Sequence, residues 1–206
     1  MRFDDMLATV LAQAADRPDR QAARWRQLVD LLAQGRSEAA AGSGEAAAYA
    51  WLRVTSKFTV EVLRDGRNWC ATVRQSHSNH PSLIYFQSVG TGAGWPAALG
   101  ALLDLALLSE QCLDDSSLVG AAVLLRAEGT GMARELAGVI GLEPLSAQRD
   151  EPQLAQAAAQ LKSSGYAIRP QVEFAVMAEQ RAEYRACVEA LADHLGKPTA
   201  PLVRQQ

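Results

Sequence analysis

The sequence is poor in cysteine and has no excess of positive charge. Its three cysteines, Cys70, Cys112 and Cys187, are odd in number and widely spaced. That usage is typical of reduced thiols in a cytoplasm rather than of a disulfide framework. Lys and Arg number 20 against 23 for Asp and Glu, a formal net charge of −3. Because nucleic-acid binding then lacks an electrostatic basis, we expect no nucleic-acid partner.

Long hydrophobic runs are also missing. A membrane-spanning helix needs roughly 20 apolar residues, whereas the best candidate, 95–108, is shorter and is interrupted by Asp104. Near the N-terminus, Asp4 and Asp5 stand where a signal peptide carries positive charge. We therefore expect a soluble, cytoplasmic chain without a membrane span of its own.

Alanine and other aliphatic residues are what the sequence has in quantity. Hydrophobic residues make up 49% of the chain and charged residues 21%, whereas aromatic residues make up only 6%. This balance supports a hydrophobic core, and alanine loses little entropy on entering a helix. The composition therefore predicts an all-α fold.

Helical periodicity and helix-breaking residues divide the chain into segments. We predict an irregular bundle of six or seven helices with an extended crossover near 80–94. A helical pair or arm at 1–34 and a small-residue linker at 35–44 precede the main helical domain, 45–206. The predicted helices span 2–15, 19–34, 45–79, 95–113, 116–140, 151–163 and 171–195.

Residues 76–103 contain no Asp, Glu, Lys or Arg. We interpret this as burial, since an unpaired charge inside a fold is expensive. The stretch then needs no catalytic role to explain its composition. The side chains expected at the centre of the core are Trp69, Tyr85, Phe86, Trp95, Leu99 and Leu103.

A glycine cluster lies between the strand-like run 82–89 and the helix that begins near Trp95. Gly90, Gly92 and Gly94 suggest a dinucleotide fingerprint, but Trp95 stands where the third glycine is required. No Gly-Lys-Ser/Thr motif occurs in the chain. We therefore interpret the cluster as a turn and expect no nucleotide or other cofactor.

His77 and His80 lie near the end of a predicted helix, and Cys70 lies seven residues before His77. Zinc requires three or four convergent ligands, for which this spacing is a weak signal. The alternative is that the histidines cap the helix C-terminus, where positive charge is favoured. We favour capping and predict no metal site.

No sequence pattern supports nucleophilic or acid–base catalysis. The cysteines and carboxylates have no recognisable catalytic context, and the alternating charges of 179–185 are typical of a solvated face. One binding hypothesis stays open. A polar cleft gathering His77, His80, Tyr85 and Arg181 would suit a small-molecule-binding protein or a small enzyme.

Two segments resemble the cytoplasmic C-terminal domain of bacterial two-transmembrane potassium channel family proteins. They are "WCATVRQSHSNHPSLIYFQSV…GWPAALGALLDLALL" and "SSGYAI…AEYRACVEALADHLGKPTAP", and together they cover about 55–203. The first carries a helical tryptophan, a Ser-His segment, a Tyr-Phe-x-Ser run and an Ala-Leu-x-x-x-Leu-Asp helix. The matching residues are Trp69, Ser76, His77, Pro81, Leu83, Tyr85, Phe86, Ser88, Trp95, Ala98, Leu99, Leu103 and Asp104.

This resemblance implies a regulatory or assembly module rather than a channel. The chain lacks the two membrane helices and the selectivity filter of the family, and Gln87 replaces the arginine expected in the Tyr-Phe-Arg-Ser run. The family contributes no catalytic residues. We therefore expect a non-enzymatic protein-interaction module that self-associates or docks on a protein partner.

Overall fold

The computed structural model describes residues 45–85, 94–144, 147–163, 165–199 and 202. These residues form five α-helices and one short 3-10 helix, with an isolated antiparallel bridge between Leu113 and Ile168. In chain order the elements are α3 (Glu45–Asn79), η1 (Pro81–Tyr85), α4 (Gly94–Gln111), α5 (Ser116–Val139), α6 (Glu151–Ser163) and α7 (Phe174–His194). The all-α prediction is confirmed.

The predicted helix boundaries agree with the structure to within a few residues wherever it describes the chain. Helix α6 begins and ends where the sequence indicated, and α7 begins three residues later than the predicted 171. The helices expected at 2–15 and 19–34 and the linker at 35–44 lie outside the described residues. A total of six or seven helices therefore stays a prediction.

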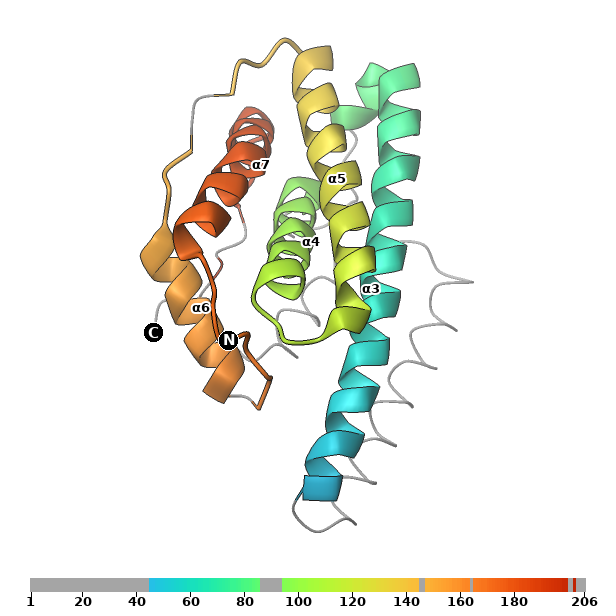
Figure 1. Ribbon diagram of the computed structural model, residues 1–206. Coiled ribbons are helices and arrows are strands. Elements are labelled where there is room, and N and C mark those ends of the chain that lie inside the picture. The colour runs from blue at the N-terminus through green and yellow to red at the C-terminus, as the bar shows by residue number, and fades with distance from the viewer. Residues whose placement is uncertain (1–44, 86–93, 145–146, 164, 200–201, 203–206) are drawn as a thin grey trace.

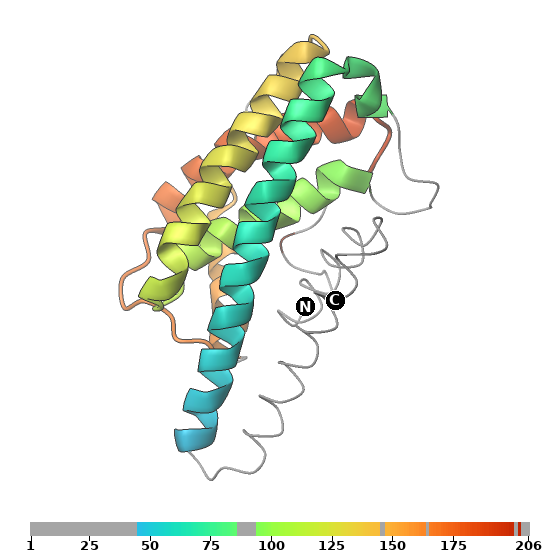
Figure 2. The same cartoon turned by 90° about the vertical axis from the view of Figure 1, so that its right-hand side faces the viewer.

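Helix α4 lies at the centre of the bundle. Figures 1 and 2 show α3 and α5 side by side, with α4 crossing behind them and α7 on its other flank. Helix α5 contacts α3, α4 and α7, while α6 packs against α7. The N-terminal end of α3 extends beyond the other helices (Figure 2).

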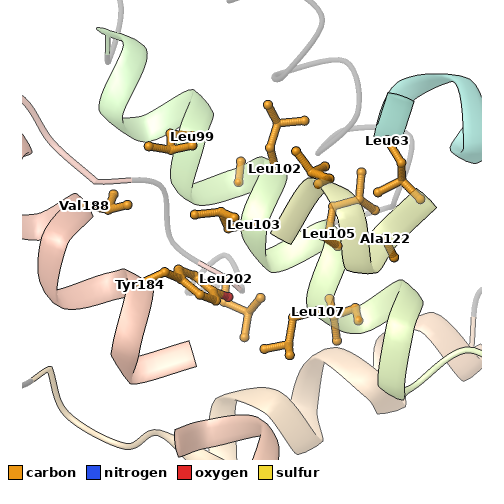
Figure 3. Close-up of a cluster of buried hydrophobic side chains, with 14 of the residues drawn as sticks. Leu63, Leu99, Leu102, Leu103, Leu105, Leu107, Ala122, Tyr184, Val188 and Leu202 are labelled. Carbon is orange, nitrogen blue, oxygen red and sulfur yellow. The ribbon is translucent and has the colours of Figure 1, made fainter. Parts of the chain in front are cut away.

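Nearly uniform burial of α4 follows from its composition. Positions 94–103 carry no charge, and most side chains from Pro96 to Ser109 are buried. A helix that is apolar on every face must be surrounded by other elements. Figure 3 shows its leucines converging with side chains of the neighbouring helices, among them Leu99, Leu102, Leu103, Leu105 and Leu107.

Two glycines allow the neighbouring helices to approach α4 closely. A Cβ atom added to Gly129 of α5 would lie 2.8 Å from Leu103 Cδ2, and one added to Gly66 of α3 would lie 3.0 Å from Leu102 Cδ2. Glycine weakens a helix interior, so the pair Asp65-Gly66 favours a kink or a break within the helix predicted at 45–79. The helix is instead continuous there, and the missing side chain makes room for Leu102.

Polar contacts fix α3 against α5 at both ends of their shared length. The Ser56 hydroxyl donates to Asp115, the residue that also caps α5 through Ser117 N. Near the other end, Arg74 Nε donates to Glu135 at 2.6 Å, and Ser78 donates to the same carboxylate. Arg74 Nη1 also donates to Glu128 at 3.1 Å, and together these contacts help to set the register of the two helices.

Part of the predicted core is correct and part is wrong. Leu99 and Leu103 are fully buried, and Trp69 and Trp95 pack partly buried against the same cluster. Tyr85, in contrast, is 55% exposed. Its neighbour Ile84 fills the core in its place, while Phe86 lies outside the described residues.

The crossover predicted near 80–94 was expected to be extended, but its described part is helical. Residues Pro81–Tyr85 form the 3-10 helix η1, and Leu83 N donates to His80 O at 2.9 Å. Proline suits the first turn of a helix because its missing N–H needs no partner there. This turn directs Ile84 inward and leaves Tyr85 outside.

Among the described helices, none combines the length and the apolar character required to cross a bilayer.

Candidate functional site

The most deeply buried charges of the described bundle gather around Asp104 in the middle of α4. Asp104 is only 4% exposed. Removing a carboxylate from water without a partner is expensive, so this position requires donors. Helix α7 provides them through Arg181, which is 3% exposed, and through the buried Tyr184. These two residues are three positions apart and therefore share one face of the helix.

Arg181 and Tyr184 both donate hydrogen bonds to the Asp104 carboxylate. Arg181 Nε lies 2.9 Å from Oδ1 and Arg181 Nη2 lies 3.0 Å from Oδ2. The Tyr184 hydroxyl donates to Oδ1 at 2.6 Å. The parallel guanidinium–carboxylate bonds are short and charge-assisted, which makes this pairing directional. We call these three residues the polar cluster; it joins α4 to α7.

The electrostatics of the polar cluster hold its protons in place. Burial, and then the Asp104 carboxylate, raise the pKa of the Tyr184 hydroxyl well above its usual value. Burial lowers the pKa of the Arg181 guanidinium, but the interactions with the Asp104 carboxylate outweigh that effect. The pKa of Arg181 is therefore raised above its usual value. Both donors therefore keep their protons near neutral pH. Neither is tuned to exchange one with a substrate, which is what a general acid or base must do.

A small recess opens beside the polar cluster, between α4 and α7. Its volume is about 10 Å³, which is close to the space that one water molecule occupies. The lining residues are Gly100, Asp104, Tyr184, Arg185, Val188, Glu189 and Thr199. A recess of this size has no room for an organic substrate in the arrangement seen.

A second group of predicted site residues lies where α3 ends. His77 Nδ1 is 3.0 Å from Ser76 Oγ, and the His77 ring meets Trp95 edge-on with ring centroids 6.1 Å apart. Burial lowers the pKa of the His77 imidazole, and a hydrogen bond to the Val73 backbone opposes that shift only in part. His80 is exposed in the turn that follows α3.

Tyr85 pairs with a histidine that the sequence analysis did not select. The Tyr85 hydroxyl lies 3.1 Å from His194 Nε2, and the two ring centroids are 5.7 Å apart. Because both side chains are exposed, this contact lies on the surface. It ties η1 to the end of α7.

The structure does not bring the four hypothesised binding residues together. His77 contacts Trp95 at the start of α4, whereas Arg181 contacts Asp104 in its middle. Trp95 and Asp104 are nine positions apart in the helix, a rise of about 13.5 Å. Arg181 therefore belongs to the polar cluster, and no shared cleft with His77, His80 and Tyr85 forms among the described residues.

The alternating charges of 179–185 in α7 were expected to lie on one solvated face, but they point in different directions. Glu179 and Glu183 are exposed and pair with Arg149 and Arg134, as expected of a surface. Arg181 points the other way and is buried. Its partner is the carboxylate of Asp104.

The three thiols are buried and free. Burial, and then the Glu128 carboxylate, raise the pKa of Cys70 to about 12, and burial raises the pKa of Cys112 to about 11. Burial also raises the pKa of Cys187. A nucleophilic or metal-binding cysteine needs the thiolate, which these environments disfavour.

The zinc alternative through Cys70, His77 and His80 receives no support from the described residues. They contain no group of three or more His, Cys, Asp or Glu side chains placed to hold a metal ion.

Sequence reasoning missed the polar cluster although one signal for it was present. Asp104 is the sole charge in the first sixteen residues of α4. In the sequence it was interpreted as an interruption of the apolar run and as one of the positions that match the potassium channel family domain. A lone carboxylate in a helix that is apolar on all faces indicates a buried partner elsewhere. The identity of that partner was not readable, because Arg181 lies 77 residues away in sequence.

No protein-family model, curated protein or solved structure matches the chain.

Proposed function

We propose that this chain is a non-enzymatic regulatory or protein-interaction module that acts by self-association. The observation that carries the proposal is the polar cluster. The buried charged side chains of the described bundle, Asp104 and Arg181, bind each other across α4 and α7, and Tyr184 donates to the same carboxylate. Their chemistry is thereby used to hold helices together, and the surface is left to make external contacts.

The outer face of α5 is the surface that suits this role best. Leu124 is 51% exposed and Val123 is 39% exposed. Gly120 and Ala127 are exposed as well, so the four residues occupy positions i, i+3, i+4 and i+7 of one stripe. No charged side chain interrupts this stripe, and its small residues permit a second helix to approach closely.

We assign this stripe to a second copy of the chain. Two identical stripes placed antiparallel would make a symmetric contact, which is the commonest arrangement in homodimers. Stable interfaces bury roughly 800 Å² on each partner. The four residues would therefore form the centre of a larger contact rather than its whole extent.

The resemblance to the cytoplasmic domain of bacterial potassium channel family proteins agrees with this proposal. Such a domain would act next to a membrane protein without spanning the membrane, and a cytoplasmic location follows from it. The matched positions Leu99, Leu103 and Asp104 all lie inside the bundle. They would therefore specify the fold of the module, while partner choice would reside on its surface.

Light scattering across a hundredfold range of protein concentration tests the proposal. We expect a dimer or larger species that dissociates in a Val123→Ser/Leu124→Ser double variant. A Val139→Ser/Val176→Ser variant is the matched control, because these valines are comparably exposed but lie outside the stripe. A monomer at every concentration, together with the absence of a specific protein partner in a pull-down, would reject the proposal.

A further inference from the structure

Opposite charges flank the apolar stripe of α5 at equal distances from its centre. Asp114 is exposed and directly precedes Asp115, the N-cap of α5. Arg134 is exposed near the other end of the helix. Each is ten positions from Leu124, the more exposed of the two large side chains in the stripe. Ten helical positions correspond to a rise of about 15 Å.

Arg134 lies on the same face of α5 as the stripe. Gly120, Ala127 and Arg134 recur at intervals of seven residues, which is close to two helical turns. Arg134 therefore continues the stripe toward the C-terminal end of α5, whereas Asp114 lies just before its N-terminal end.

Both charges have hydrogen-bonding capacity that the described residues do not use. No described side chain donates a hydrogen bond to the Asp114 carboxylate. Arg134 donates to Glu183 at 2.6 Å through Nη2, but a guanidinium carries five N–H donors. The side chains of this pair are 63% and 56% exposed, so solvent screens it strongly. Arg134 can therefore bind a second carboxylate while it keeps Glu183.

The other charges beside the stripe are already paired within the chain. Arg126 donates twice to Glu110, and Arg74 donates to Glu128 and Glu135. These pairs lie on the two flanks of α5 that face α7 and α3. Asp114 and Arg134 are thus the charges best placed to meet another molecule that covers the stripe.

We propose that α5 pairs with α5 of a second copy in an antiparallel register fixed by two symmetric ion pairs, each between Arg134 of one copy and Asp114 of the other. This inference rests on the proposed self-association and specifies the recognition at that surface. A two-fold axis near Leu124 brings the two positions together, because they lie at equal distances from it in opposite directions. The ion pairs then form a polar rim around the apolar centre of Val123 and Leu124.

A parallel register lacks this complementarity. It opposes Arg134 with Arg134 and Asp114 with Asp114, and like charges placed face to face disfavour association. It also aligns the two helix dipoles, whereas the antiparallel register sets the N-terminus of each helix near the C-terminus of the other. The charges therefore select the antiparallel register.

A charge swap between two full-length variants tests the proposal by sedimentation velocity at low ionic strength. In Asp114→Arg the introduced arginine meets Arg134 of the other copy, and in Arg134→Asp the introduced aspartate meets Asp114. We expect the dimer dissociation constant of each variant alone to rise at least about tenfold. An equimolar mixture of the two variants should return to within about threefold of the unaltered chain, because both contacts of the mixed dimer are then attractive. The double variant Asp114→Arg/Arg134→Asp should recover in the same way.

Two controls separate recognition from damage to the fold. Arg149→Asp reverses an arginine that is 65% exposed and pairs with Glu179 of α7 as Arg134 pairs with Glu183, but it lies outside the stripe, and it should leave dimerisation unchanged. Asp114→Asn removes a charge without creating repulsion, so it should weaken the dimer less than Asp114→Arg does. Circular dichroism shows whether each variant keeps its helices.

The outcomes distinguish this register from self-association itself. Single reversals that dimerise as tightly as the unaltered chain, or a mixture as weak as either variant alone, would overturn the antiparallel register. If the Val123→Ser/Leu124→Ser variant still dissociated in that case, self-association through the stripe would stand. An unaltered chain that is monomeric at every concentration would overturn both proposals.

Discussion

At the scale of single residues, buried polar atoms either find partners or weaken the fold. Asp104, Arg181 and Tyr184 satisfy one another. Two atoms among the described side chains do not: Trp95 Nε1 and Ser109 Oγ are buried without a hydrogen-bond partner. Such an atom loses its hydration without compensation.

Ser109 therefore offers a stabilising substitution. Replacing it by alanine removes the unpaired hydroxyl and introduces a better helix former, and we expect Ser109→Ala to raise the free energy of unfolding by about 1 kcal/mol. Urea denaturation of both proteins measures the difference. A loss of stability in Ser109→Ala would mean that the hydroxyl has a partner in solution.

His77 gives the protein a predictable response to acid. Burial lowers its folded-state pKa below the ordinary value of 6.5, so the unfolded chain takes up a proton at a higher pH than the folded chain does. Stability therefore falls as the pH drops from about 6.5 toward the folded-state value. Acidification favours unfolding over that interval and has no such effect above it.

A His77→Gln variant isolates this contribution. Between pH 7.5 and pH 5.5 we expect the free energy of unfolding to decrease more in the unaltered protein than in the variant. Urea denaturation at both pH values gives the four numbers required. An identical pH dependence in the two proteins would show that His77 is not buried against Trp95.

At the scale of secondary-structure elements, most of the helix boundaries were predictable because they depend on local chemistry. Asp115 accepts from Ser117 N at the start of α5, and Gly141, Gly165 and Gly196 follow α5, α6 and α7 with positive φ. These are capping and chain-reversal signals that act within a few residues. Gly66 was misleading because its role depends on Leu102 of another helix.

Two glycines of α5 separate the packing role of glycine from its conformational cost. In Gly129→Ala, the new methyl group would stand 2.8 Å from Leu103 Cδ2, and we expect a loss of about 1–3 kcal/mol from overpacking. In Gly138→Ala it would meet nothing within 4 Å. We expect that variant to gain up to about 1 kcal/mol.

Thermal and urea unfolding of the two variants provide the comparison. Because both changes are glycine to alanine within one helix, differences in helix propensity cancel. Equal stability of Gly129→Ala and Gly138→Ala would contradict the close packing of α4 against α5 at Gly129.

At the scale of the whole molecule, the sequence predicted which residues are helical better than which residues meet. The uncharged stretch 76–103 was interpreted as buried. That is correct for most of 96–103, with Leu99 and Leu103 fully buried, but wrong for 79–82 and Tyr85, which are exposed. The surface position of Tyr85 was not predictable, since it depends on how η1 turns and on His194, which lies 109 residues away. Pairing over such separations leaves no periodic signal in a single sequence.

The polar cluster is the central element of this account, because its buried ion pair between Asp104 and Arg181 holds α4 against α7. Removing one partner of a buried pair leaves the other charge uncompensated, which costs about 3–5 kcal/mol. Removing both charges leaves an apolar contact of similar volume. The two single losses should therefore exceed the loss in the double variant when added together.

A double-mutant cycle of Asp104→Leu and Arg181→Leu, followed by urea unfolding, tests this claim most directly. The account predicts that each single variant loses about 3–5 kcal/mol and that the double variant is more stable than either single variant alone. Additive losses, or single variants that unfold like the original chain, would contradict it and would leave α4 and α7 without the link proposed to join them.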